Sequence, residues 1–369
     1  MSSDRAKDRV YNFSAGPANL PLSVLQKAQR DLLSLPGVGA SILEISHRSR
    51  AFLEILADAE ERLRTLLEIP EGYEVLFLQA GSRLQFSMVP MNLLRPVGAP
   101  AEYVVTGSWG KKALEQARLV GDVNVVWDGQ ESNYDRLPPS DELMFSETAA
   151  YVHTTSNETI QGVQFAADLD AGAAPLVADM SSDFLSRPIN VSKYGLIYAC
   201  AQKNAGPAGV TIVIVRNDLL PRSDDRLPGY LNYQEHAKSG SLYNTPCTFG
   251  IYLVGLVAKW LQEEIGGLAA MQRVNRGKAA LLYDLIDSSE DFYIGHAQAD
   301  CRSLMNVTFR LPSVELTRQF VEEAAATGLD QLQGHRSVGG IRASIYNAMP
   351  TAGVESLHDF MRDFRIRNA

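Results

Sequence analysis

Six short apolar runs in the first two thirds of the chain constrain the fold more than any other feature. The runs cover residues 74–78, 103–105, 149–153, 175–178, 196–201 and 210–215. Helix-length polar or amphipathic segments separate several of them. Continuous apolar runs are typical of strands that are buried on both faces, as in a parallel sheet covered by helices. The sequence therefore predicts an α/β fold with a large, mostly parallel mixed sheet flanked by helices.

The pattern changes after about residue 268. Helical spacing and strand-like alternation follow one another over residues 268–286, 305–309, 314–327, 341–345 and 354–364. This order is typical of a small α+β unit. The change of pattern predicts a boundary within the helix 268–286. We expect a large domain over residues 20–272 and a smaller domain made of residues 1–19 and 273–369.

Charge and cysteine content narrow the class of function. Acidic residues outnumber basic ones by 43 to 34, for a formal charge of −9, which disfavours binding to a nucleic-acid backbone. The three cysteines are widely spaced and form no CxxC pair, so we expect neither disulfides nor a metal site. The N-terminus lacks the apolar core of a signal peptide, and no apolar stretch has the length of a membrane span. These features predict a soluble cytoplasmic protein of enzyme size.

Lys203 is the first candidate for chemistry. It follows the apolar run 196–201 and precedes Gly-Pro-Ala-Gly and another apolar run. A lysine between two core strands is costly to bury as an ammonium, so we expect its pKa to be lowered, which suits a Schiff-base nucleophile. The alternative is a lysine whose amine reaches the surface from the end of a strand.

Asp179 ends the apolar run before Lys203. Ligands of open α/β sheets bind beyond the carboxyl ends of the strands, so the two side chains are expected to meet in one crevice. A buried carboxylate opposite a Schiff-base lysine is what a pyridoxal phosphate (PLP) enzyme needs, because it keeps the pyridine nitrogen protonated. Taken alone, Asp179 also fits a helix N-cap.

Three further candidates follow other predicted strands. Ser82 and Arg83 lie where a strand meets a helix start, a place that favours anion binding. Trp109 offers a flat ring on which a cofactor can stack, and Thr159 offers a hydroxyl for a ring substituent. Each has a purely structural alternative, namely a glycine turn, ordinary packing or a loop hydrogen bond. Their order along the chain, each after a different strand, favours a cofactor site.

The chain resembles the phosphoserine aminotransferases in YNFSAGPANLP, ISHRSR, NETIQG, SRPINVSKYGLIYACAQKNAGPAG, YNTPCTF and GHRSVGGIRASIYNAMP. The resemblance runs from Tyr11 to the C-terminal helix. It implies a class V, fold-type I PLP-dependent aminotransferase that forms a homodimer with shared active sites. The implied reaction is a ping-pong transamination between L-glutamate and 3-phosphohydroxypyruvate, which gives O-phospho-L-serine and 2-oxoglutarate for L-serine biosynthesis. The resemblance also suggests a related substrate of vitamin B6 biosynthesis, 3-hydroxy-2-oxo-4-phosphooxybutanoate.

The resemblance also implies residue roles. Lys203 matches the Schiff-base lysine, and Asp179 matches the partner of the pyridine nitrogen. Trp109 matches the stacking ring, and Thr159 the ligand of the ring hydroxyl. The phosphate-binding positions are matched by Ser82, Arg83 and Gln202, with Asn244 and Thr245 from the neighbouring subunit. The substrate-binding positions are matched by Arg342 for the α-carboxylate, and by His47, Arg48, and the partner chain's His335 and Arg336 for the distal anion.

Arg342 is supported independently by its place in the alternating run 341–345, where it points away from the apolar face. Its fork-shaped guanidinium can hold a carboxylate through two hydrogen bonds. For each His-Arg pair, the alternative is a solvated loop.

Three positions depart from the family pattern: Ala80 in the phosphate turn, Ala205 beside the lysine, and Cys247 where a second proline is usual. None removes a group that catalysis requires. The alternatives are another class V PLP aminotransferase or a non-catalytic PLP-binding homologue. A cysteine desulfurase is disfavoured because it needs a reactive cysteine on a mobile loop, whereas Cys200 lies in a predicted strand and Cys247 beside a proline. A nicotinamide dehydrogenase is disfavoured because no GxGxxG follows the early strands.

Overall fold

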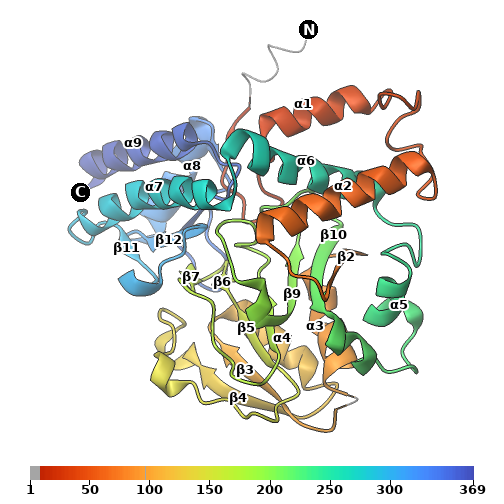
Figure 1. The fold of residues 1–369 in the computed structure, drawn as a ribbon. Helices are drawn as coiled ribbons and strands as arrows, with labels where there is room; N and C mark the ends of the chain where they lie inside the picture. Colours follow the sequence, from red (N-terminus) through yellow and green to blue (C-terminus); the bar gives the residue numbers. More distant parts are fainter. Residues whose placement is uncertain (1–8, 96) are drawn as a thin grey trace.

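The computed structural model describes residues 9–95 and 97–369. Its centre is a seven-stranded sheet with strand order β2-β10-β9-β8-β5-β3-β4 (Figure 1). The strands, in sheet order, are β2 (Tyr73–Gln79), β10 (Val210–Arg216), β9 (Tyr194–Cys200), β8 (Leu176–Asp179), β5 (Val152–Thr155), β3 (Ala101–Val105) and β4 (Val123–Asp128). Only β10 runs antiparallel to its neighbours, so the predicted mostly parallel mixed sheet is confirmed.

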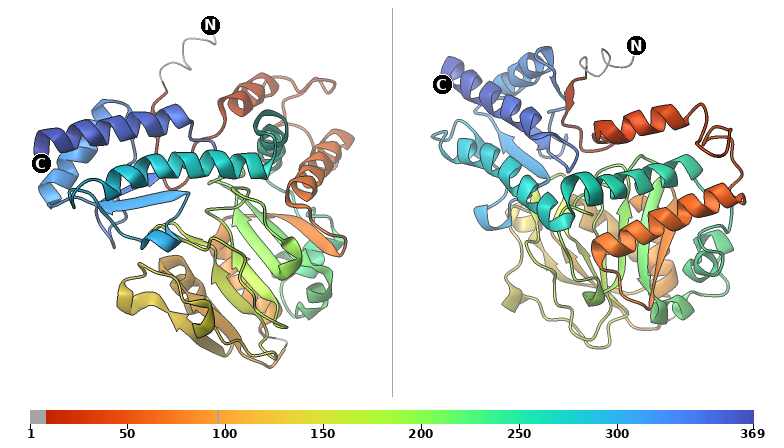
Figure 2. Two further views of the ribbon diagram at one scale, coloured as in Figure 1. Left: turned by 60° about the vertical axis from the view of Figure 1, so that its left-hand side comes forward. Right: turned by 45° about the horizontal axis from the view of Figure 1, so that its top comes forward.

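Helices cover both faces of this sheet. One face packs against α2 (Arg50–Leu67) and α6 (Thr248–Trp260), as both views in Figure 2 show. The other face packs against α3 (Ser82–Leu93) and α4 (Ser108–Ala117). Along β2, Val75 and Phe77 belong to the first core and Leu76 and Leu78 to the second, as the period of two in a strand requires. All six apolar runs are therefore strands of the buried sheet.

The edge strand β4 is not among the predicted runs. Its side chains are exposed or half-buried, so the segment lacks the continuous apolar character of the central strands.

A second, smaller core lies at the C-terminal end of the chain. Its three-stranded antiparallel sheet has the order β11-β12-β14, and its helices pack around that sheet. The elements are α7 (Leu268–Asp287), β11 (Ile294–Gly295), β12 (Asn306–Arg310), α8 (Val314–Ala326), β13 (Leu329–Asp330), β14 (Ile341–Ser344) and α9 (Thr351–Asn368). The N-terminal segment joins this unit, because β1 (Tyr11–Asn12) pairs with β13 and Phe13 is buried in the same core.

Within residues 9–95 and 97–369, no helix combines the length and the apolar character needed to cross a membrane.

Candidate active site

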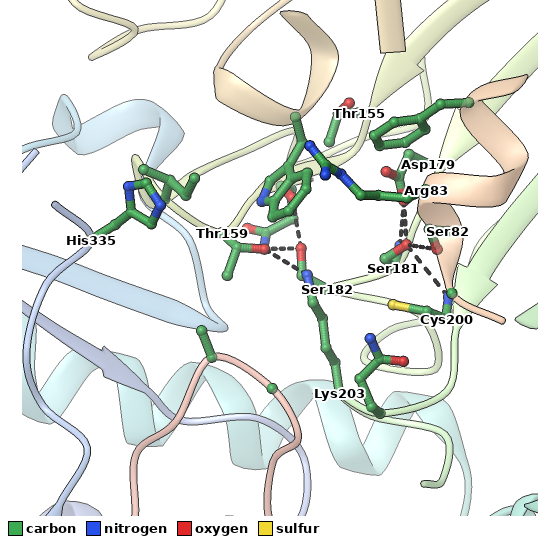
Figure 3. A pocket seen from close by; sticks show the side chains of 18 of the residues that line it. Ser82, Arg83, Thr155, Thr159, Asp179, Ser181, Ser182, Cys200, Lys203 and His335 are labelled. Atoms are coloured by element: carbon green, nitrogen blue, oxygen red, sulfur yellow. Dashed lines mark hydrogen bonds between the residues drawn. The ribbon is translucent and has the colours of Figure 1, made fainter. Parts of the chain in front are cut away.

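A cavity of about 450 Å³ opens beyond the carboxyl ends of the parallel strands (Figure 3). It lies between the large sheet and the loop and strand that carry His335 and Arg342. Its lining residues are Ala15, Gly16, Gly81, Ser82, Arg83, Phe86, Trp109, Thr155, Asn157, Thr159, Ile160, Asp179, Ser181, Ser182, Cys200, Gln202, Lys203, His335 and Arg342. Strand ends, helix starts and the smaller unit thus contribute to one site, as expected for an open α/β sheet.

Lys203 reaches into this cavity from the loop after β9. Its Nζ donates a hydrogen bond of 2.8 Å to Thr159 Oγ1 and lies 5.8 Å from the centroid of the Trp109 ring. Burial disfavours the charge on the amine, but Tyr346, Cys200 and the Asp179 carboxylate outweigh that effect, so the pKa of Lys203 is raised. The expectation of a lowered pKa was therefore wrong. It neglected acidic groups that other segments bring next to the amine.

Asp179 ends β8, on the strand beside the one that leads to Lys203. One carboxylate oxygen, Oδ1, accepts hydrogen bonds from the Ser181 backbone N–H, at 2.9 Å, and from the Ser181 hydroxyl. Ser181 Oγ is in turn 2.6 Å from Ser82 Oγ. Burial raises the pKa of Asp179 against the opposing effect of these Ser181 hydrogen bonds. The Ser181 hydrogen bonds thus hold the carboxylate in one orientation, in which it can accept a hydrogen bond from a cationic N–H group in the cavity.

Helices α3 and α4 both begin at the cavity, but side chains cap the backbone N–H groups of the first turn only in α4. Helix α3 begins at Ser82 behind the N-cap Gly81, which makes no side-chain capping bond. In α4, by contrast, the side chains of Glu158 and Gln161 accept the N–H groups of the first turn. The N-terminus of α3, beside Ser82 and Arg83, is therefore the place in the cavity for an anionic group.

Several polar atoms around the cavity are buried without a hydrogen-bond partner among the described residues. Four of them belong to lining residues: Trp109 Nε1, Thr155 Oγ1, Gln202 Oε1 and Arg342 Nε. Buried polar groups are normally paired, so unpaired atoms around one cavity indicate a polar ligand. An open helix start, a flat ring, a carboxylate and an amine fit PLP, which presents a phosphate, an aromatic ring, a ring nitrogen and an aldehyde.

The structure brings nine of the fourteen predicted site residues to this cavity: Ser82, Arg83, Trp109, Thr159, Asp179, Gln202, Lys203, His335 and Arg342. It does not bring the other five to the lining: His47, Arg48, Asn244, Thr245 and Arg336. One assignment needs correction. The histidine at 335 was expected from the partner chain, yet it lines the same chain's cavity as Lys203, because the loop before β14 folds over that side.

Two of the family departures have a clear structural setting. Ala80, in the turn before α3, has a φ of 75°, a left-handed conformation that favours glycine. Its carbonyl accepts a 3.0 Å hydrogen bond from Thr211 Oγ1, which ties the turn to β10. Ala205 is fully buried in the core between the sheet and α6. The turn therefore keeps its glycine-like shape despite the alanine.

Sequence reasoning missed several residues of the site. Glu158 and Gln161 bind the start of α4 across about 50 residues of sequence, so no local pattern reveals them. Ser181 lies only two residues after Asp179, to which it donates, but its contact with Ser82 spans 99 residues. Lys112 is a further case, since its Nζ lies 4.2 Å from the centroid of the Trp109 ring. Its position three residues after Trp109, on the same face of α4, is the one signal that the sequence held.

Lys112 adds to a positively charged rim. Burial and the nearby Arg83 and Arg336 lower its pKa, against the opposing effect of Glu158 and Glu115. Burial, Arg342 and Lys112 likewise lower the pKa of His335. Cations from α3, α4 and the loop before β14 thus influence one another at this side of the cavity, which is suited to an anionic ligand.

Comparison with known proteins places the chain among aminotransferases. Residues 10–357 match the aminotransferase class-V family. A phosphoserine aminotransferase from Rhodopirellula baltica is 56% identical over 370 residues, which cover 100% of this chain and 98% of that protein. Another from Geobacillus kaustophilus is 54% identical and covers 98% and 99% of the two chains.

Solved structures agree with these relatives. The phosphoserine aminotransferase from Bacillus circulans subsp. alkalophilus superposes with a TM-score of 0.96 at 51% identity, covering 98% of this chain and all of that chain. A PLP-bound phosphoserine aminotransferase from Trichomonas vaginalis gives a TM-score of 0.90 at 41% identity, covering 96% and 100%.

Proposed function

The chain belongs to the aminotransferase class-V family, and we propose that it is a PLP-dependent phosphoserine aminotransferase. It would transfer the amino group of L-glutamate to 3-phosphohydroxypyruvate, giving 2-oxoglutarate and O-phospho-L-serine. The observation that carries the proposal is the meeting of Lys203 and Asp179 in one cavity, beside the open start of α3. The relatives that match almost the whole chain bear the same activity in their names.

Each end of PLP has a matching group in the cavity. Ser82, Arg83 and Gln202 line the cavity and would bind its phosphate, and the centroid of the Trp109 ring lies 5.8 Å from the Lys203 amine. Asp179 would accept the hydrogen bond of the pyridine nitrogen, and Thr159 that of the ring hydroxyl. Bound in this way, PLP supplies an electron sink for the bond that breaks at the substrate Cα.

The protein's own residues supply the proton transfer and the substrate contacts. Lys203 is positioned to take the proton from the substrate Cα and return it as general base and acid. Arg342, with its unpaired buried Nε, would hold the α-carboxylate that both substrates share.

The distal anion differs between the two substrates, being a carboxylate in glutamate and a phosphate in 3-phosphohydroxypyruvate. We assign it to His335 and Arg336, where burial, Arg342 and Lys112 lower the pKa of His335. Both anions can use the same donors in alternate half-reactions, because each is acceptor-only and binds to cationic N–H groups.

We further propose that the enzyme is a cytoplasmic homodimer with shared sites. His47, Arg48, Asn244 and Thr245 lie outside the lining of their own chain's cavity, which leaves them available to the other subunit. The division into a large domain of residues 20–272 and a small domain of residues 1–19 and 273–369 also stands as a proposal. The burial of Phe13 in the smaller core supports it.

A two-step spectroscopic titration tests the activity. The purified protein with PLP should be yellow, and borohydride should fix the cofactor to Lys203. Glutamate should bleach the visible band, and 3-phosphohydroxypyruvate should restore it. A protein that binds no PLP would contradict the whole proposal. Bleaching by glutamate without recovery on the phosphorylated keto acid would contradict only the substrate, and would favour another class V aminotransferase.

A further inference from the structure

The first turn of α4 is held by side chains from a distant hairpin. A helix leaves its first N–H groups without intrahelical acceptors, and the N-cap Gly107 supplies no side-chain acceptor. The hairpin of β6 (Asn157–Glu158) and β7 (Val163–Gln164) supplies them instead. Gln161 Oε1 accepts from the Ser108 N–H at 3.2 Å, Glu158 Oε2 from the Trp109 N–H at 2.9 Å, and Glu158 Oε1 from the Gly110 N–H at 2.8 Å.

The helix start is shaped around the Glu158 carboxylate. Glu158 is fully buried, and a Cβ at position 107 would lie 2.4 Å from its Cδ, so only glycine fits there. A carboxylate at a helix N-terminus is favoured by the helix dipole as well as by the two hydrogen bonds. Burial raises the pKa of Glu158 to about 7, against the opposing effect of the Gly110 and Trp109 N–H groups. A buried acid on two backbone N–H groups is a specific construction rather than a surface cap.

The same hairpin also holds the Lys203 amine. Thr159, the residue after Glu158, accepts the hydrogen bond from Lys203 Nζ. Glu158 accepts a hydrogen bond from the backbone N–H of Trp109. The centroid of the Trp109 ring is 5.8 Å from Lys203 Nζ. Two adjacent residues of this hairpin, Glu158 in β6 and Thr159 just after it, therefore contact the start of α4 and the Lys203 amine, which come from two other parts of the chain.

We infer that Glu158 is a positioning residue that fixes the first turn of α4 and thereby holds the Trp109 indole at the stacking distance for PLP. The inference rests on the proposed function, because it concerns how the cofactor ring is supported. Stacking depends on geometry at the level of about 0.5 Å, so a loosened helix start would weaken cofactor binding without removing any group that touches the cofactor.

The variant Glu158→Gln tests the inference. It keeps the size of the side chain, but its Nε2 cannot accept a hydrogen bond and would face a backbone N–H. We expect a folded protein with an unchanged far-ultraviolet circular dichroism spectrum. The near-ultraviolet circular dichroism signal of Trp109 in the cofactor-free protein should change. This signal is the part of the spectrum that is lost in Trp109→Phe. PLP should dissociate roughly tenfold more readily, as the loss of a charged hydrogen bond implies. The control Glu147→Gln removes an exposed carboxylate that accepts none of the N–H groups in the first turn of α4, and it should change neither quantity.

A double-mutant cycle separates positioning of Trp109 from any other effect. In a Trp109→Ala background, Glu158→Gln should weaken PLP binding by much less than tenfold, because no ring remains to be positioned. Equal effects in both backgrounds, or an unchanged indole spectrum and PLP affinity, would overturn the inference.

If Glu158→Gln does not fold, Gln161→Ala takes its place. It should cause smaller changes in the same direction, and the absence of any change would count against the inference. Failure of the unaltered protein to bind PLP would contradict the proposed function instead.

Discussion

The amine of Lys203 and the hydroxyl of Thr159 form a hydrogen bond of 2.8 Å across 44 residues of sequence. Thr159 follows the short strand β6, whereas Lys203 lies in the loop after the central strand β9. The bond keeps a long, flexible side chain directed into the cavity, where it lies 5.8 Å from the Trp109 ring centroid. The bond therefore holds in place the amine that would form the Schiff base in the proposed function.

Replacing Thr159 by valine should impair both the holding of the amine and the binding of PLP. Valine keeps the shape but removes the hydroxyl that accepts from Lys203, a loss of about 1 kcal/mol or roughly fivefold in affinity or rate. The PLP dissociation constant and kcat measure these two effects. Thr154→Val is a matched control, because Thr154 is buried with an unpaired hydroxyl and does not line the cavity. A Thr159→Val enzyme with the control's properties would contradict this role.

The two arginines that we propose to bind substrate should respond differently to substitution. Arg342→Lys keeps the charge but loses the planar fork, so KM for glutamate and for the phosphorylated keto acid should both rise, by about tenfold or more. Arg336→Gln should raise KM more for the phosphorylated keto acid than for a keto acid whose distal end is uncharged, because only the former carries a distal dianion. Steady-state kinetics with three substrates check both statements. Equal losses for the phosphorylated and neutral keto acids in Arg336→Gln would exclude a distal-anion role.

Much of this site could be predicted because it obeys the rule for strand ends. Asp179 and Lys203 each follow a continuous apolar run, and neighbouring parallel strands bring their carboxyl ends together. The alternation around Arg342 likewise predicted a side chain on the open face of its strand, and Arg342 lines the cavity. These are properties of single segments, which a sequence displays directly.

The remainder depends on contacts between distant segments. Glu158 caps a helix that begins 50 residues earlier, and its own neighbours show no capping pattern. The predicted lowering of the Lys203 pKa was wrong for the same reason. The sequence shows that the amine is buried, but it does not show the acidic groups that surround the amine and raise its pKa. The edge strand β4 escaped detection because an edge strand needs no continuous apolar run.

His153 should make the stability of the folded protein depend on pH. It is fully buried in β5, with Nε2 at 2.8 Å from the Tyr198 hydroxyl, and burial lowers its pKa to about 3 from 6.5. The unfolded chain takes up a proton near pH 6.5 whereas the folded chain does not. Its contribution is therefore fully present above pH 6.5 and falls by about 1.4 kcal/mol per pH unit as the pH falls toward 3.

Urea unfolding at a series of pH values checks this statement. His153→Gln should be less stable at pH 8 but should lose less stability between pH 6.5 and 4.5 than the unaltered protein, because glutamine takes up no proton. Both proteins must be compared at the same concentration, since the stability of the proposed dimer would depend on it. Parallel pH curves for the two proteins would contradict the assignment.

Lys112 should contribute to the capture of anionic substrates. Its Nζ lies over the Trp109 ring, at 4.2 Å from the centroid, and Arg83 and Arg336 influence its pKa from the same side. Lys112→Met keeps a long apolar stem on the ring but removes the charge. We expect kcat/KM for the phosphorylated keto acid to fall about threefold to tenfold at low ionic strength, and the difference to shrink as salt is added.

The neighbouring lysine provides the comparison that makes this measurement decisive. Lys111 carries the same charge on the same helix, but it is exposed and its Nζ donates to Gln130 Oε1 at 2.9 Å. Lys111→Met should leave both kcat/KM and its salt dependence nearly unchanged, since the charge it removes is screened by solvent.

If Lys111→Met and Lys112→Met behave alike, the net charge of the protein explains the effect. If only Lys112→Met loses activity and the loss persists at high salt, packing on Trp109 rather than charge is responsible. Only a loss that is specific to Lys112 and disappears with salt supports a role in substrate capture.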